Sequence, residues 1–150
     1  MLKRASQRPR SRGFTLVESM IAVAISAILA SLSYPTFADQ LRKGRRVDAI
    51  ARLAQLQQAE ERWRANNTSY GSLAALGVAA QTADGLYRLS VIDAQATGYV
   101  VLAEAQGGQL RDTACRFMQL SVAGGNTVRN SGADASVGNS AVINDRCWNR

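Results

Sequence analysis

Residues 12–20 read RGFTLVESM, and the next letters, IAVAISAILASLSYPTFA, carry an apolar run on to residue 38. A run of about 25 such residues is long enough to cross a hydrocarbon core of about 30 Å as a helix. Glu18 is the one formally charged residue in it. A carboxylate inside a membrane-spanning segment costs roughly 2.5–3.5 kcal/mol on insertion scales, so such groups are usually paired and functional. Any function assigned to this chain has to explain Glu18.

The positive charge of the chain is concentrated ahead of this run. The 150 residues have a formal net charge of +7, but five of the 18 basic residues precede Gly13. The other 13 face 11 acidic residues. A basic N-terminal flank predicts a cytoplasmic N-terminus and a translocated remainder. A cleaved secretory signal peptide is the alternative, because small-residue stretches such as AVA lie within the run.

The chain is predicted to continue as one helix from Phe14 to Ala65. Pro35 removes a backbone hydrogen bond and is expected to kink this helix. Beyond Pro35 the helix becomes amphipathic, because apolar residues recur there at spacings of three and four. These residues are Ile50, Leu53, Leu56, Ala59 and Trp63. The polar run NNTSYG, residues 66–71, ends the helix.

The remaining sequence predicts a small antiparallel sheet. Strands are expected at Leu86–Asp93, Tyr99–Ala105 and Cys115–Val122, with a short fourth strand at 127–129 and a loop at 130–140. The fold class is therefore α+β. A long N-terminal helix, apolar in its first half and amphipathic in its second, packs on the sheet.

Two cysteines, Cys115 and Cys147, lie in the part that would be exported. In an oxidising compartment they can form one disulfide. Closing a loop of about 32 residues contributes about 3–4 kcal/mol in the chain-entropy model. Two free, buried thiols are the alternative.

The composition argues against catalysis. The chain has no histidine, which removes the commonest general base and metal ligand. Two cysteines without histidine make no zinc set, and the glycine pairs fit no phosphate loop. We therefore predict no enzyme activity, no cofactor and no metal.

The segment RKGRR, Arg42–Arg46, has two interpretations. We favour a solvated helix face just outside the membrane. The alternative is a patch that binds DNA phosphates or acidic neighbours. Trp63 and Tyr70 are expected to pack in the core or at the helix end.

The N-terminal residues resemble the type IV pilin family. Prepilins begin with a basic leader ending in glycine and continue with F-T-L-x-E, which here is Gly13 followed by Phe14, Thr15, Leu16, Val17 and Glu18. Pro35 matches the helix-kinking proline of the family. The segments GQLRDTACRFMQLS and DRCW look like those of Gram-negative minor pilins.

This resemblance implies a maturation pathway. Residues 1–13 form the leader, a prepilin peptidase cuts between Gly13 and Phe14, and the same enzyme methylates the new Phe14 amine. Residues 14–38 then span the inner membrane once, with the N-terminus cytoplasmic, and later form the filament core. Residues 39–150 form a periplasmic head.

The resemblance also implies a role for Glu18, which would pair with the Phe14 amine of a neighbouring subunit. Pairing within one helix is the alternative. The expected function is a structural subunit of a type IV pilus serving adhesion, twitching motility or DNA uptake, and the resemblance favours the minor class of pilin. Its partners would be other pilins, through their N-terminal helices, and the inner-membrane assembly machinery. A type II secretion pseudopilin and a single-span periplasmic anchor are the alternatives, and DNA is a further candidate ligand.

Overall fold

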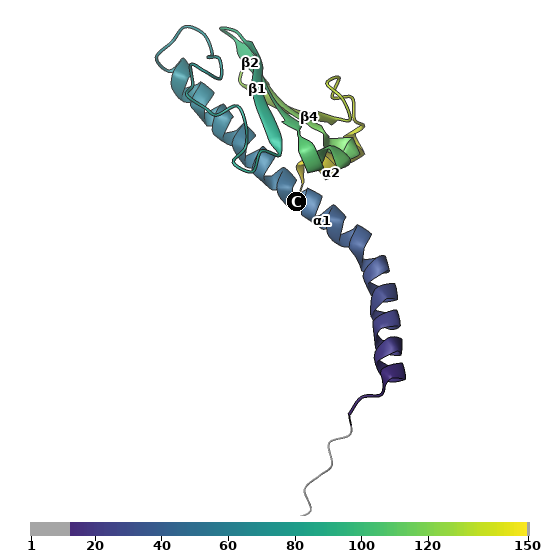
Figure 1. The fold of residues 1–150 in the computed structure, drawn as a ribbon. Helices are drawn as coiled ribbons and strands as arrows, with labels where there is room; N and C mark the ends of the chain where they lie inside the picture. The colour runs from purple at the N-terminus through teal and green to yellow at the C-terminus, as the bar shows by residue number, and fades with distance from the viewer. Residues whose placement is uncertain (1–12, 150) are drawn as a thin grey trace, which may run out of the picture. The chain divides into compact units, whose positions relative to one another are not determined.

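The computed structural model describes residues 13–149. The predicted leader therefore lies, except for Gly13, outside the described residues. The described chain falls into two compact units, one ending at Phe37 and the other beginning at Ala38. Figure 1 traces the elements of each unit along the chain.

The predicted long helix is confirmed. Helix α1 spans Leu16–Arg64, 49 residues, and its helical backbone continues through Pro35. The kink at Pro35 stays a prediction. In the first unit the side chains from Phe14 to Tyr34 are exposed. An 18-residue window of α1 has a mean hydropathy of 2.0 with none of it buried, so length and composition suit a membrane span.

The second unit contains a four-stranded antiparallel sheet in which consecutive strands are neighbours. Its strands are β1 (Tyr87–Ala94), β2 (Gly98–Ala105), β3 (Phe117–Ala123) and β4 (Asn126–Gly132). The first two agree with the predicted strands to within one residue at each end. Cys115 was wrongly placed in the third strand, because the chain there forms the 3-10 helix η2 (Thr113–Cys115). The fourth strand is longer than predicted.

The core of this unit lies between α1 and one face of the sheet. Leu53 and Leu56, two of the predicted residues, are fully buried, and so is Ala49, which was not predicted. The other predicted residues, Ile50, Ala59 and Trp63, are only partly buried. The three fully buried residues pack with alternate residues of the first three strands: Tyr87, Leu89, Tyr99, Val101, Ala103, Ala105, Met118, Leu120 and Val122. Burying a side chain the size of Leu or Val stabilises the fold by about 1.5–3 kcal/mol. The sheet thus buries the apolar face of the amphipathic half of α1, as the sequence pattern predicted.

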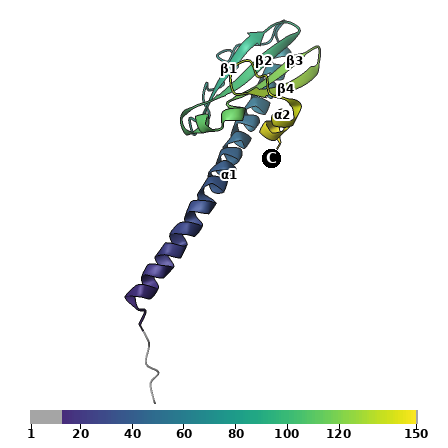
Figure 2. The same ribbon diagram turned by 90° about the vertical axis from the view of Figure 1, so that its right-hand side faces the viewer.

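A short C-terminal helix, α2 (Ala141–Trp148), was not predicted. Figure 2 shows it beside β4. The Asn144 side-chain amide donates a hydrogen bond to the Arg129 carbonyl oxygen at 2.8 Å, and the Trp148 indole donates to the Asn130 carbonyl oxygen at 3.1 Å. These bonds satisfy the outer edge of β4, which would otherwise be open to pairing with another chain.

A carboxylate, Glu60, is completely buried near the end of α1. Its Oε2 accepts a hydrogen bond from the Gly71 backbone N–H at 2.8 Å, which holds the chain that follows α1. Burial raises the pKa of Glu60, and the nearby Glu61 raises it further, whereas the Gly71 hydrogen bond lowers it. Desolvation therefore outweighs the hydrogen bond.

This raised pKa predicts a pH dependence of stability. The pKa of Glu60 in the folded head lies above its ordinary value of 4.5. The ionised carboxylate therefore costs folding free energy, and stability present below pH 4.5 is lost as the pH rises through the folded pKa. Glu60→Gln keeps an acceptor for Gly71 and removes the titration. Urea unfolding of residues 38–150, which hold the whole described core, should show wild type losing stability relative to this variant between pH 4 and pH 7. A pH-independent difference would contradict the assignment.

Candidate functional site

The N-terminal candidate residues lie together around the start of α1. Gly13, Phe14, Thr15 and Glu18 line a shallow depression of about 420 Å³. The Glu18 backbone N–H donates a hydrogen bond to Thr15 Oγ1 at 3.2 Å. Thr15 therefore caps the helix, since an N-cap hydroxyl satisfies one of the free N–H groups of the first turn. Thr and Glu three residues apart are the signature of a capping box, a signal that our sequence prediction overlooked.

This cap gives Glu18 a local role besides any pairing. Glu18 lies in the first turn of α1, where the helix dipole favours an anion. Within the described residues its carboxylate has no ion pair closer than 4.0 Å, and it is exposed. The carboxylate is thus positioned at a defined helix start and available to a cation.

The rest of the first unit presents large apolar side chains to its surroundings. Phe14 is 83% exposed, and the large apolar side chains after it for which an exposed fraction is known, from Leu16 to Phe37, are each more than half exposed. A helix that is apolar on all sides belongs in lipid or against other helices. This surface therefore requires a membrane, a bundle of like helices, or each in turn. The residues concerned include Leu16, Val17, Met20, Ile21, Val23, Ile25, Ile28, Leu29 and Leu32.

The predicted disulfide is confirmed in the head. Cys115 and Cys147 are bonded, and both are buried. The bond joins η2 to α2, so it fixes the C-terminal helix beside the sheet.

The basic segment is not the uniformly solvated helix face that we favoured. The Arg46 side chain is only 13% exposed, and its Nε lies 3.2 Å from Oδ2 of Asp112, whose side chain is equally buried. Arg46 also donates a hydrogen bond to the Arg146 carbonyl oxygen at 2.9 Å. Burial raises the pKa of Asp112, while Arg46 and Arg42 lower it. The Arg46 side chain is buried because the Asp112 carboxylate pairs with its charge and the Arg146 carbonyl oxygen accepts a hydrogen bond from it.

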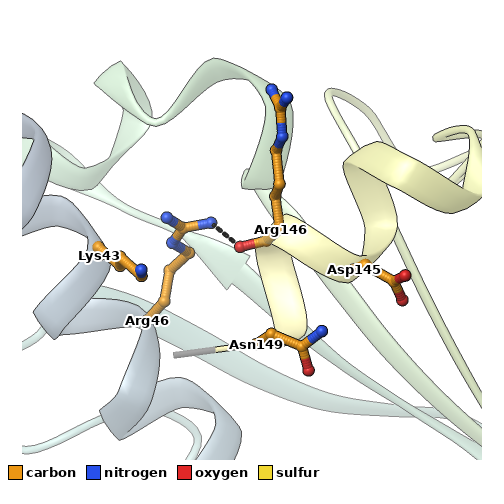
Figure 3. Close-up of a pocket in the computed structure, with 5 residues that line it drawn as sticks. All are labelled: Lys43, Arg46, Asp145, Arg146 and Asn149. Carbon is orange, nitrogen blue, oxygen red and sulfur yellow. Dashed lines mark hydrogen bonds between the residues drawn. The ribbon is translucent and has the colours of Figure 1, made fainter.

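Figure 3 shows the depression beside this contact, lined by Lys43 and Arg46 of α1 and by Asp145, Arg146 and Asn149. Its volume is about 400 Å³. The Arg146 carbonyl faces Arg46 while its guanidinium extends away, and the Asp145 carboxylate points away from Lys43. Neither the Asp145 carboxylate nor the Arg146 guanidinium therefore contacts Arg46 here; the Arg146 carbonyl oxygen does.

Two aromatic residues pack as predicted. The Tyr70 ring lies 4.6 Å from the Tyr99 ring, centre to centre, and Tyr70 packs against the core. Trp63 lies against Gly71 and is half-buried. Among residues 13–149, no three His, Cys, Asp or Glu side chains gather as a metal site would require.

The chain combines an N-terminal helix, apolar in its first half and with an acid in its capped first turn, and an α+β head. In the head a sheet buries the apolar face of the second half of that helix. This combination defines a pilin-like filament subunit. The comparisons agree. Residues 8–34 match the family model of the prokaryotic N-terminal methylation motif. Residues 35–119 match the model described as "Type IV minor pilin ComP, DNA uptake sequence receptor". Because that match covers more than half of the chain, the chain belongs to the type IV minor pilin family.

Individual relatives support this family. The chain is 30% identical to the type IV wide pilus major component PilA4 of Thermus thermophilus over 65% of this chain and 76% of that protein. It is 32% identical to the type II secretion system core protein G of Pectobacterium carotovorum, over 67% of this chain and 72% of that protein. The type IV major pilin protein PilA of Myxococcus xanthus is 36% identical, over 44% of this chain and 30% of that protein.

The disulfide generates a stability prediction. Because it closes a loop of 32 residues, replacing both cysteines by alanine should lower the free energy of unfolding of the head by about 3–4 kcal/mol. Urea unfolding of the C115A/C147A variant measures this loss, and reduced wild type serves as the matched control. An unfolding midpoint equal to that of oxidised wild type would show that α2 is held without the bond.

Proposed function

We propose that this chain is a minor subunit of a type IV pilus, processed by a prepilin peptidase between Gly13 and Phe14 and methylated at Phe14. Residues 14–38 hold it in the inner membrane with a cytoplasmic N-terminus, and residues 39–150 form the periplasmic head. The inner-membrane assembly machinery then moves it into a surface filament. The observation that carries this proposal is the carboxylate of Glu18 in the capped first turn of a wholly apolar, exposed helix.

Cleavage gives Glu18 a partner of opposite charge. The new Phe14 amine is a cation four residues before Glu18 in the same chain, and a second copy offers the same cation in the filament. An unpaired buried charge is costly, so an amine from a neighbour that meets Glu18 favours one register of the helices. The Thr15 cap supports this role, because it satisfies the Glu18 backbone N–H without using the carboxylate.

The head favours a type IV pilus over a secretion pseudopilus. The N-terminal motif is common to both classes, so it does not discriminate between them. The minor-pilin model matches residues 35–119, most of which lie in the head. The pseudopilin of type II secretion remains the alternative, supported by the similarity to core protein G. A single-span periplasmic anchor would keep its leader.

Duplex DNA is the second candidate ligand, and the description of the family model as a DNA uptake sequence receptor is the observation that favours it. Exposed arginines of the head, such as Arg62 and Arg129, are available to phosphates. Affinity for DNA that falls steeply with salt would support this function.

Processing is tested by the intact mass of the membrane-associated protein. We expect a chain that begins at methylated Phe14 in cells with prepilin peptidase and at Met1 in cells without it. Gly13→Ile should leave the precursor uncut, because a side chain at this position obstructs a small-residue site. Gly44→Ala, at a helical position with open space around it, is the control and should be processed normally. A peptidase-independent Met1 start would indicate the simple anchor, and cleavage within the apolar run would indicate a secreted protein.

The role of Glu18 is tested separately from processing. Glu18→Ala should be cut and inserted normally, yet enter filaments roughly a hundredfold less than wild type, because it leaves an amine unpaired at a cost of about 2.5–3.5 kcal/mol. The readout is the ratio of the subunit in sheared filaments to the subunit in membranes. Ser19→Ala, the adjacent polar residue, is the control. Normal incorporation of Glu18→Ala would refute the pairing.

A further inference from the structure

Four cations at one end of the head have no ion pair within the described chain. Lys43 and Arg45 belong to α1, Arg111 to the 3-10 helix η1 (Gly107–Arg111) and Arg146 to α2. We call these four residues the basic collar. The acids nearest in sequence are already occupied, because Asp39 pairs with Arg42 and Asp112 pairs with Arg46. Asp48 lies 3.9 Å from Arg52. Asp84 is held mainly by hydrogen bonds from Thr82 and Leu86, although Arg45 also lowers its pKa. Asp145 points away from Lys43.

The contacts of Arg42, Arg45 and Arg46 bring the three elements of the collar together. The Gln109 side-chain amide donates a hydrogen bond to the Arg42 carbonyl oxygen at 3.2 Å, which fixes η1 on α1. The Arg45 guanidinium reaches Gly108 of η1. On the other side, Lys43 and Arg146 line the same depression, where Arg46 binds the Arg146 carbonyl oxygen. The collar is therefore a defined surface.

Chain length places this collar at the level of lipid headgroups. Lys43 and Arg45, the collar residues of α1, follow Ala38 by five and seven residues, about 8 and 11 Å of helix at 1.5 Å per residue. The headgroup layer on each side of a bilayer is about 5–7 Å thick, since the whole bilayer is 40–45 Å across and its hydrocarbon core about 30 Å. The backbone of Lys43 and Arg45 thus lies just beyond this layer, at a distance that long basic side chains bridge to reach the phosphates.

Exposed leucines accompany the cations. Leu41, which precedes Arg42, is 45% exposed, and Leu110, which precedes Arg111, is 46% exposed. Exposed apolar side chains beside basic ones are typical of segments that lie in a membrane interface. Duplex DNA offers phosphates but no apolar layer for these leucines. The combination therefore favours lipid over nucleic acid.

We propose that the basic collar binds the phosphates of anionic phospholipids, such as phosphatidylglycerol, in the periplasmic leaflet, with Leu41 and Leu110 inserted between headgroups. The lipids hold the head of the unassembled subunit against the membrane. This proposal rests on the proposed membrane placement of residues 14–38. Each basic residue near an anionic surface strengthens binding about fivefold at low salt.

Hydrogen exchange of the full mature chain in nanodiscs tests this docking. The discs contain either phosphatidylcholine alone or phosphatidylcholine with phosphatidylglycerol, and the readout is the exchange of peptides 107–116 and 141–149. We expect slower exchange of both peptides with phosphatidylglycerol, and loss of that protection in high salt. Lys43→Gln with Arg111→Gln should weaken docking about 25-fold. Arg52→Gln with Arg88→Gln removes the same charge from two surface ion pairs elsewhere on the head and should leave the lipid-dependent protection unchanged.

Other outcomes overturn the proposal. Equal protection in both lipids would show that headgroup charge is irrelevant. Protection in phosphatidylcholine discs by inorganic phosphate alone would indicate a free-anion site, and protection by duplex DNA but not by phosphatidylglycerol would assign the collar to DNA. Protection found only in assembled filaments would assign it to a neighbouring subunit. Failure of residues 14–38 to insert would leave no chain in the discs, so failed membrane placement is distinguishable from failed docking.

Discussion

The buried contact between Arg46 and Asp112 connects α1 to the segments around η2 and α2 of the head. Arg46 belongs to α1, Asp112 precedes η2, and the Arg146 carbonyl that Arg46 also binds belongs to α2. One guanidinium thus joins the long helix to both segments that the disulfide connects. Burial removes water from the Asp112 carboxylate and raises its pKa, even though Arg46 and Arg42 lower it. Removing one partner from a pair this buried leaves the other charge uncompensated, which is why it specifies the packing so strongly.

How much of this could be predicted from the sequence depended on the length and period of each pattern. Helix α1 and the first two strands were predicted almost to the residue, because long periodic patterns report which face is buried. Helix α2 has only eight residues, and its apolar residues Val142 and Ile143 are exposed. Its sequence therefore has no periodic apolar face from which a helix could be predicted. Strand β4, NTVRNSG, lacks apolar alternation, since only Ser131 and Gly132 at its end are buried. Both elements depend on partners distant in sequence.

The candidate site divides in the same way. The motif from Gly13 to Glu18 could be recognised in the sequence because its residues are close together in the chain. The structure adds that Thr15, within this motif, caps α1. The burial of Arg46 could not be predicted from the sequence, because nothing in RKGRR distinguishes one arginine from the next. Asp112 lies 66 residues further along the chain and makes that distinction only after folding. Charge runs therefore locate a basic surface without revealing which of its members are available to a ligand.

Glu18 and the basic collar impose opposite electrostatic demands on the two ends of the membrane-spanning segment. In the proposed pathway Glu18 is an acid in an apolar layer, so the subunit gains when a neighbour supplies an amine. If the collar binds anionic headgroups as proposed, leaving the bilayer costs those contacts. Assembly is then favourable only where the gain at Glu18, together with helix packing, exceeds the loss at the collar. On this proposal, the balance between the two charged regions decides whether a subunit remains in the membrane or enters a filament.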